Sequence, residues 1–281
     1  MAHNHDASAW SEHSDKWASS VQQITAAPCR ELLNMMLMLS PPVHESPKFF
    51  DNGAGSGMFT STILQANPKA RITAADVSSG MINTLKAEAK KQGWTTVTTL
   101  VADASDLRAA GIKDGSFTFT AGTAFLPFVQ DPAKVVAEMA RITEPSGIVA
   151  VSTWSRVSWV PLWEEAVQKT LDSSYKAPAL FHPGTTERDD VADLLLGAGL
   201  QNVTAKVFEC YHPPRTSVEA AVEEFYGMGN PSIQLLHKGF TVEQLERTRP
   251  VFAEAYARTY NGTQKRQIEL AILAVGQKPI S

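Results

Sequence analysis

The chain has few of the features that mark secreted, membrane-spanning or nucleic-acid-binding proteins. It has two cysteines in 281 residues, too few for a disulfide framework and typical of a reducing compartment. No apolar run approaches the roughly 18 residues of a membrane span, and the polar N-terminus does not resemble a secretory signal. The net charge of −4 offers no basic face to a nucleic acid. These absences predict a cytoplasmic protein with neither a membrane nor a nucleic-acid partner.

What the chain does contain is the alternation of an α/β protein. Its length and its 43% hydrophobic content suit one large domain, or one domain with a cap. Short apolar runs alternate with helical patterns, which predicts a mostly parallel sheet with helices on both faces. We expect strands near 47–51, 71–76, 97–102, 116–121, 147–153, 203–210 and 266–275. Ligands of such sheets bind at the carboxyl ends of the strands.

The stretch FFDNGAGSGMFT, residues 49–60, organises the first of these units. A buried strand closes on Asp51, glycines follow at positions 53, 55 and 57, and a helix pattern starts directly after them. A strand, a glycine turn and a helix form the nucleoside- or phosphate-binding turn of doubly wound proteins. Glycine is needed where the backbone turns sharply and a ligand lies against it. Alone, the run is equally compatible with a tight turn that binds nothing.

A second acid strengthens the interpretation. Asp76 ends the next predicted strand, 76 − 57 = 19 residues after the last glycine. An acid at this distance is placed to hold ribose hydroxyls. The alternative is that Asp76 only caps the helix that starts near Ser79. The dinucleotide-binding fingerprint requires a small residue at its last position, where this chain has Met58 or Thr60. The Gly-Lys-Ser/Thr of a P-loop is not present either.

The alternating glycines of DNGAGSG instead resemble motif I of the class I methyltransferases, which bind S-adenosylmethionine. Segments 75–81, 101–104, 117–132 and 138–154 resemble the motifs that follow in this family. Thr118 stands where an acid is common, so this strand offers no base. The resemblance implies a Rossmann-like, doubly wound, seven-stranded sheet, mostly parallel with an antiparallel edge strand. It also implies that the cofactor is S-adenosylmethionine, and the product S-adenosylhomocysteine.

The resemblance further implies a set of cofactor contacts. The first acid lies near the methionine end, the glycines pass under the ribose, Asp76 holds the ribose, and residues 77, 81, 103 and 104 surround the adenine. With the N-terminal aromatic residues, the predicted cofactor-binding residues are Trp10, Trp17, Asp51, Gly53, Ala54, Gly55, Gly57, Asp76, Val77, Met81, Asp103, Ala104 and Gly122.

Additional segments flank this core. Two helices are predicted ahead of the first strand, over 10–20 and 28–39, and helices in this place close over the cofactor in small-molecule methyltransferases. We therefore expect residues 1–44 to form a lid and residues 45–281 the methyltransferase domain. Two insertions rich in aromatic residues are expected, near 155–185 and 211–262. The first lacks clean strand periodicity, and the second has two helical patterns, over 217–228 and 241–259. They predict a helical cap over a medium-sized apolar substrate, or else a helical pair that completes the core or a dimer interface.

The reaction itself leaves little trace in a sequence. Methyl transfer from a sulfonium depends mainly on alignment, so a catalytic residue is not obligatory. His182, His212 and His13 are the candidates for a base, each with the alternative of a packing or loop residue. The histidine spacing offers no metal motif, and Cys210 suits a small buried hydrophobe better than a nucleophile.

The whole chain is similar to the small fungal methyltransferases of secondary metabolism. The order of its segments resembles that of methyltransferases of the gliotoxin bis-thiomethyltransferase type. That resemblance implies methylation of a small molecule, with two successive transfers to a dithiol as the first hypothesis. O- or N-methylation of another small molecule is the alternative, and a non-catalytic regulator that keeps the fold is another. Acceptor atom, substrate, number of methyl groups and oligomeric state stay open.

Overall fold

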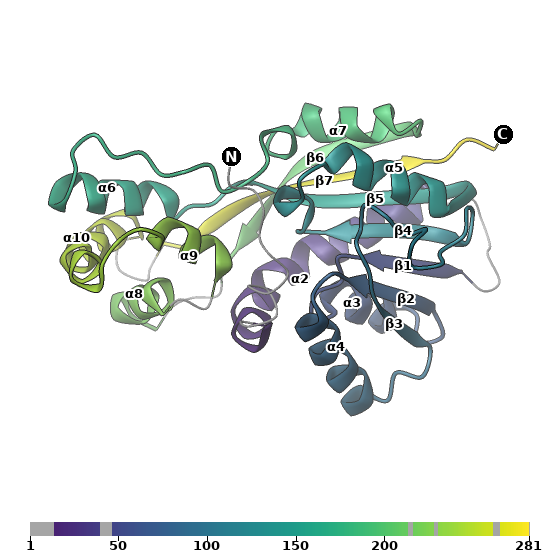
Figure 1. Ribbon diagram of the computed structural model, residues 1–281, viewed down its shortest axis with the longest axis horizontal. Coiled ribbons are helices and arrows are strands. Elements are labelled where there is room, and N and C mark those ends of the chain that lie inside the picture. Colours follow the sequence, from purple (N-terminus) through teal and green to yellow (C-terminus); the bar gives the residue numbers. More distant parts are fainter. Residues whose placement is uncertain (1–13, 40–46, 213–215, 228–229, 261–264, 281) are drawn as a thin grey trace.

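A seven-stranded mixed sheet forms the centre of the molecule (Figure 1). The computed structural model describes residues 14–39, 47–212, 216–227, 230–260 and 265–280. The strand order is β3-β2-β1-β4-β5-β7-β6. Strands β1 to β5 run parallel, and β7 is antiparallel to both β5 and the edge strand β6, so the expected mostly parallel sheet is confirmed. The strands are β1 (Lys48–Asn52), β2 (Arg71–Asp76), β3 (Val97–Val101), β4 (Phe117–Thr123), β5 (Thr143–Arg156), β6 (Gln201–Tyr211) and β7 (Ile268–Gln277).

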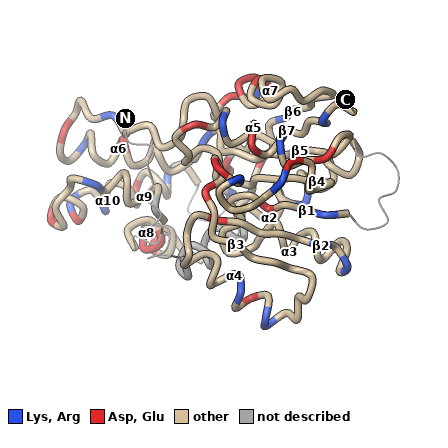
Figure 2. The backbone as a smooth tube through the Cα atoms, turned by 45° about the vertical axis from the view of Figure 1, so that its right-hand side comes forward, with Lys and Arg blue, Asp and Glu red and all other residues tan. Residues whose placement is uncertain are grey.

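Helices cover both faces of the sheet, because the central strands bury side chains on both sides. Helices α2 (Ser14–Leu39), α3 (Met58–Ala66) and α4 (Ser79–Gln92) cover one face. Helices α5 (Pro132–Ile142) and α7 (Arg188–Gly197) cover the other. Figure 2 shows basic and acidic residues interspersed over these elements. Among the residues with described placement, no helix is long and apolar enough to cross a bilayer.

The expectation of two separate N-terminal helices is wrong. Helix α2 runs without a break from Ser14 to Leu39 and contains Pro28 in its interior. Proline removes one backbone hydrogen bond from a helix. The buried face formed by Thr25, Cys29, Leu32 and Met36 follows helical spacing across that point and packs against the sheet. The packing of one continuous apolar face against the sheet therefore compensates for the backbone hydrogen bond that Pro28 removes.

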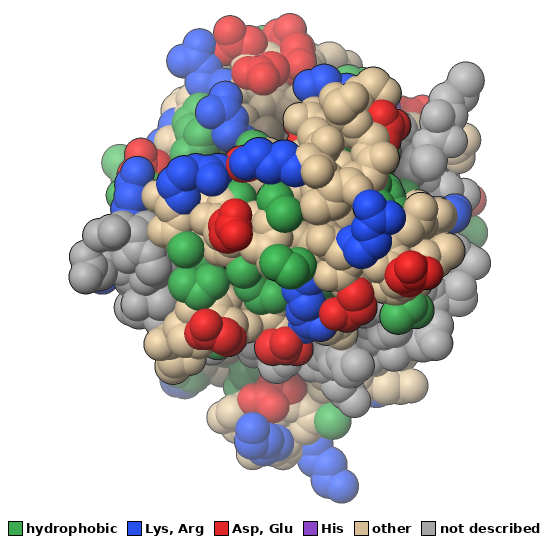
Figure 3. Space-filling view, turned by 90° about the vertical axis from the view of Figure 1, so that its left-hand side faces the viewer, with side chains coloured by type: hydrophobic (Ala, Val, Ile, Leu, Met, Phe, Trp, Pro, Cys, Tyr) green, Lys and Arg blue, Asp and Glu red, His purple; other side chains and the backbone are tan. Residues whose placement is uncertain are grey.

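The second insertion and the segment after β5 fold together into a helical cap. The segment 155–183, which lacked periodicity in the sequence, contains α6 (Val160–Thr170), and the second insertion contains α8 (Val218–Tyr226), α9 (Pro231–His237) and α10 (Val242–Tyr260). The cap lies at one end of the sheet (Figure 1). The outer face at this end carries hydrophobic, basic and acidic side chains side by side (Figure 3).

The aromatic residues of the cap pack against one another. Trp163 is fully buried, and its ring contacts the rings of Tyr175, Phe225, Tyr226, His237 and Phe240. These side chains form the core of the cap itself, and it is this core that holds α6, α8 and α10 together.

His237 is a polar residue inside this aromatic core. It is 3% exposed, and neither ring nitrogen has a hydrogen-bond partner within the described part of the chain. Burial lowers the pKa of the imidazole to about 4. Below pH 6.5, the usual pKa of histidine, the imidazole is protonated in the unfolded chain, whereas in the folded chain it stays neutral down to about pH 4. His237 therefore does not change the free energy of unfolding above pH 6.5, and it lowers that free energy as the pH falls from 6.5 to 4.

We predict that His237→Phe makes the protein more stable and less sensitive to acid. Phe fills the same space and leaves no unpaired polar atom. Between pH 7 and pH 4, wild-type protein loses on the order of 3 kcal/mol more unfolding free energy than the variant. Urea unfolding of both proteins across this pH range measures the difference. Parallel pH profiles for the two would contradict the prediction.

Candidate functional site

The glycine stretch forms the turn between β1 and α3, at the carboxyl ends of the parallel strands. Gly53, Gly55 and Gly57 all have positive φ angles, of 69°, 53° and 94°. A Cβ at position 53 would lie 2.4 Å from the Phe125 ring, and one at position 57 would lie 2.2 Å from the Leu85 side chain. At Gly55 a Cβ would meet no atom of the described residues within 4 Å. The outer two glycines are therefore needed for packing, whereas Gly55 presents bare backbone to open space.

This contrast gives a matched pair of variants. We predict that Gly55→Val folds with some loss of stability, because its φ of 53° strains a β-branched residue, and that it loses affinity for the ligand of this turn, because the added bulk projects into the space on its outer side. Gly57→Val is expected to lower the thermal unfolding temperature sharply, because its side chain collides with the buried Leu85. Thermal unfolding of both variants, with ligand calorimetry on Gly55→Val, measures this. A Gly55→Val variant that bound normally would show that the turn does not touch the ligand.

Asp51 lies under the turn and is fully buried. Its Oδ2 accepts hydrogen bonds from the backbone N and the hydroxyl of Thr60, at 3.0 and 2.7 Å. Its Oδ1 has no hydrogen-bond partner among the residues that the structure describes. Burial raises the pKa of this carboxyl to about 6, against the two bonds from Thr60. A buried carboxylate oxygen without a donor indicates a site for a cation or a hydrogen-bond donor.

Asp76 ends β2 and ties the glycine turn to the next helix. Its Oδ2 accepts from the backbone N of Gly55 and its Oδ1 from the backbone N of Ser78, both at 2.9 Å. The cap of α4 is Ser78, whose hydroxyl accepts from the backbone N of Met81. The alternative that Asp76 itself caps this helix is therefore wrong. Its carboxylate lies at the carboxyl ends of the parallel strands, where a ligand bound by the turn would lie.

The other predicted cofactor residues are spread along the same edge of the sheet. Val77 and Asp103 are exposed, Met81 and Ala54 are buried, and Ala104 is half-buried. Gly122 lies in β4, where a Cβ would strike the Phe125 ring. Trp10 and His13 lie outside the described residues, as does the side chain of Trp17.

The remaining histidine candidates are both engaged within the fold. His182 accepts a hydrogen bond from the backbone N of Gly184 through Nδ1 and begins a short 3₁₀ turn, η2 (Pro183–Thr185). His212 is 8% exposed and lies 2.8 Å from the carboxylate of Glu269. Cys210 is buried, and burial raises the pKa of its thiol to about 12, as expected for an inert residue. Among the side chains with described placement, no cluster of metal ligands is found.

Sequence reasoning missed Glu269. It stands in β7 at a position that faces inward, between strand residues that are otherwise mostly apolar. The signal was present, because a lone acid at an inward position of an alternating strand requires a partner. That partner could not be named before the fold brought Ser158 and His212 to it.

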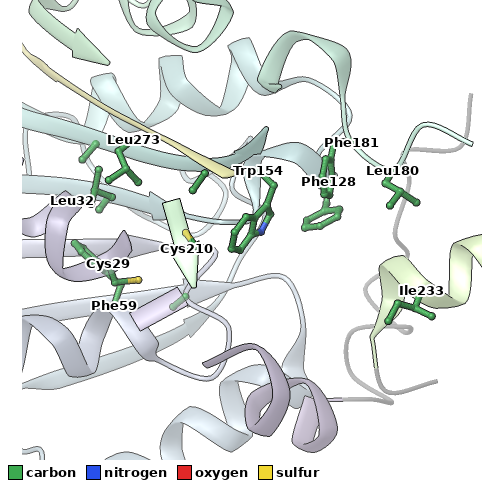
Figure 4. Close-up of a cluster of buried hydrophobic side chains, with 14 of the residues drawn as sticks. Cys29, Leu32, Phe59, Phe128, Trp154, Leu180, Phe181, Cys210, Ile233 and Leu273 are labelled. Carbon is green, nitrogen blue, oxygen red and sulfur yellow. The ribbon is translucent and has the colours of Figure 1, made fainter. Parts of the chain in front are cut away.

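A small cavity lies between α2 and residues of strands β4, β5 and β7. It has room for about one water molecule. The residue that follows β4, Ala124, has a positive φ of 57° and donates its backbone N to the Ser152 backbone oxygen at 2.9 Å. Figure 4 shows the Trp154 side chain at this end of the sheet, with Phe128 and Phe181 in contact beyond it. The cavity is lined by Thr25, Pro28, Cys29, Thr123, Ala124, Ser152, Thr153, Trp154 and Ala271.

Comparison with known proteins gives a family match for part of the chain. Residues 50–151 match the model of a methyltransferase domain. The match spans about a third of the chain, and the cofactor expected for such a domain is S-adenosylmethionine.

Two fungal methyltransferases are similar to this chain. It is 23% identical over 190 residues to the methyltransferase tpcH of Aspergillus fumigatus, covering 63% of this chain and 66% of that protein. It is 30% identical over 133 residues to the methyltransferase ucsB of an Acremonium species, covering 43% and 46%. The chain thus spans about half to two thirds of the length of the curated relatives it matches.

A solved structure supports the fold. The phosphoethanolamine N-methyltransferase 2 of Haemonchus contortus, in complex with phosphomonomethylethanolamine and S-adenosylhomocysteine, superposes with a TM-score of 0.50. The identity is 15%, and the match covers 89% of this chain and 52% of that one. At this identity the likeness concerns the architecture of the sheet and its helices.

The residues of the turn fit S-adenosylmethionine. The unpartnered Oδ1 of Asp51 suits a ligand that carries an ammonium and a sulfonium charge. The bare backbone at Gly55 leaves open space on the ligand side of the turn. Both features lie at the carboxyl ends of β1 and β2, where a nucleoside ligand binds in this architecture.

Proposed function

We propose that this methyltransferase transfers methyl groups from S-adenosylmethionine to a small-molecule acceptor. The acceptor we favour is a thiol of a secondary metabolite, with two successive transfers to a dithiol. The observation that carries the proposal is the turn itself: it begins at Asp51, whose buried Oδ1 has no partner among the described residues, and it contains Gly55, whose backbone faces no described atom. The fungal relatives, both named methyltransferases, agree with it. O- or N-methylation of another small molecule is the alternative within this proposal.

Each of the three residues at the carboxyl ends of β1 and β2 has a role in the proposal. Asp51 neutralises positive charge at the methionine end, the turn at Gly55 lies against the ribose, and Asp76 accepts from the ribose hydroxyls. Helix α2 lies over the cavity as part of the proposed lid, and Trp154 and Cys29 keep water out of it. The bound cofactor supplies a methyl group on a positively charged sulfur. The chain then has to align the acceptor with that methyl group in a dry site, which strengthens the electrostatics there.

Isothermal titration with S-adenosylhomocysteine, with NAD as the control, tests the cofactor. We expect micromolar binding of the first and none of the second. Mass spectrometry with dithiothreitol, a phenol and an amine then tests the acceptor, with a gain of two methyl groups on the dithiol as the expected result. A protein that binds S-adenosylhomocysteine but methylates none of them would favour a non-catalytic regulator.

A further inference from the structure

The ring of Phe125 lies against the glycine turn. Phe125 comes after β4 and directly before the short 3₁₀ helix η1 (Leu126–Phe128). A Cβ built on Gly53 would lie 2.4, 2.6 and 2.8 Å from Cγ, Cδ1 and Cδ2 of this ring. Because these three bonded ring atoms are at such similar distances, the backbone of Gly53 lies over one face of the ring. An aromatic side chain is therefore part of the turn, although the sequence pattern did not predict it.

A second glycine leaves room for the same ring from the neighbouring strand. A Cβ on Gly122, in β4, would lie 2.5 Å from Cε1 of Phe125. Gly122 pairs with Asn52, the last residue of β1. Ala124, between β4 and Phe125, has a φ of 57°, a conformation that strains a residue with a Cβ. Two glycines and one strained alanine thus hold this ring at the carboxyl ends of β1 and β4.

Phe125 is only half-buried, whereas Leu126 and Phe128 beside it are buried. It packs against the apolar cluster that includes Val135 and Met139 of α5. A single exposed apolar side chain would by itself mean little. This one lies in contact with the glycine turn, at the strand ends where ligands of doubly wound sheets bind. Its position therefore indicates contact with the ligand of the turn.

The order of the strands indicates which part of the cofactor lies beside the ring. Strands β3, β2, β1 and β4 are neighbours in this order. In the proposed function, Asp76 at the end of β2 accepts from the ribose, and Asp51 in β1 lies at the methionine end. The next strand in the same direction, about 4.8 Å farther on, is β4, which leads into Phe125. The ring is thus on the methionine side of the ribose, where the cofactor carries its sulfonium, and away from the adenine.

The chemistry of the sulfonium suits an aromatic partner. S-adenosylmethionine carries a positive charge on its sulfur, whereas S-adenosylhomocysteine has a neutral thioether at the same place. The electron-rich face of an aromatic ring attracts a cation, and the attraction grows where water is excluded. A leucine side chain offers apolar contact without this electrostatic attraction. An aromatic ring at this position would therefore distinguish the charged cofactor from the neutral product.

We propose that the ring of Phe125 contacts the sulfonium of the bound cofactor and makes the protein prefer S-adenosylmethionine over S-adenosylhomocysteine. This inference rests on the proposed function and adds a binding residue to it. Asp51 attracts positive charge through its carboxylate, and Phe125 does so through the face of its ring. S-adenosylhomocysteine, which remains after the transfer, lacks the sulfonium charge and gains nothing from this attraction. Fresh cofactor therefore displaces the product more readily.

Separate titrations with the charged cofactor and the neutral product test the proposal. Isothermal titration of wild-type protein and Phe125→Leu is done without an acceptor, so that no methyl group is transferred. We expect Phe125→Leu to bind S-adenosylmethionine about fivefold more weakly and to keep its affinity for S-adenosylhomocysteine. Phe128→Leu is the matched control, because the Phe128 ring is buried against Phe181 instead of the turn. It is expected to keep the wild-type ratio of the two affinities.

Fluorination of the ring separates its electrostatics from its shape. Fluorine withdraws electron density from the face of the ring, so 3,4,5-trifluorophenylalanine at position 125 is expected to weaken binding of S-adenosylmethionine alone. This protein also carries the test if Phe125→Leu does not fold. Equal weakening of both ligands would assign the ring a packing role and overturn the proposal, as would unchanged affinities. Wild-type binding of S-adenosylhomocysteine tests the proposed function separately: if it is intact, an unchanged ratio in the variants overturns only the role of Phe125, and if it is absent, both proposals fail.

Discussion

Asp76→Ala is expected to abolish binding of S-adenosylhomocysteine while the protein stays folded. The carboxylate bonds the backbone N of Gly55 and of Ser78, so its loss loosens the glycine turn. It also removes the proposed acceptor for two ribose hydroxyls. Two lost hydrogen bonds to a charged group, each about 1.5–3 kcal/mol, correspond to at least a hundredfold loss of affinity. Isothermal titration measures the affinity, and circular dichroism shows whether the fold persists.

The control for this experiment is Asp106→Ala. Asp106 is exposed and its side chain bonds only to the nearby backbone N of Ala109 among the described contacts. It is expected to bind S-adenosylhomocysteine like the wild-type protein. Unchanged affinity in Asp76→Ala would exclude the ribose role and leave Asp76 as a residue that shapes the turn.

Of the substitutions predicted to act on the fold, Glu269→Ala is expected to lower the free energy of unfolding the most. The change leaves the donors of Ser158, Gln267 and His212 without their acceptor in a buried place. Removing one partner from a buried ionic or hydrogen-bonded pair costs about 3–5 kcal/mol. Urea unfolding measures this free energy. Because these donors stand at the bases of both insertions, we expect the cap to unfold first, which hydrogen exchange of α6 and α10 would show.

Glu209→Ala is the matched control, one residue before the strand partner of Glu269. Glu209 is exposed and accepts from the hydroxyl of Tyr211. A surface contact of this kind contributes little to stability. A Glu269→Ala variant as stable as Glu209→Ala would show that the buried cluster can rearrange around the missing carboxylate.

The geometry of the glycine turn was predictable because its information is local. Asp51, the three glycines and Asp76 occur in one β-α-β unit, where strand length and turn chemistry fix their relative places. The positive φ angles at all three glycines explain why glycine is needed there. Their contacts with S-adenosylmethionine remain predictions, and the calorimetry above tests them.

The helical segments were less predictable. Sequence pattern broke the N-terminal segment at residues 21–27 and predicted a helical cap near 155–185 without giving the bounds of a helix, whereas the structure has a continuous α2 and a helix α6. Local propensity decides neither case. The proline in α2 is tolerated because the buried face continues past it onto the sheet. Helix α6 is stabilised by Trp163, whose aromatic partners come mainly from more than 50 residues later in the chain.

The sequence by itself determined the class of fold, the glycine turn and its two acids, because short-range spacing encodes them. Only the tertiary structure decided that Glu269 meets Ser158 and His212, that Gly55 faces open space, and that the cap aromatics form a core of their own. These contacts join residues up to 111 positions apart. Nothing in local spacing specifies such pairs, because it is burial against the whole sheet that selects them.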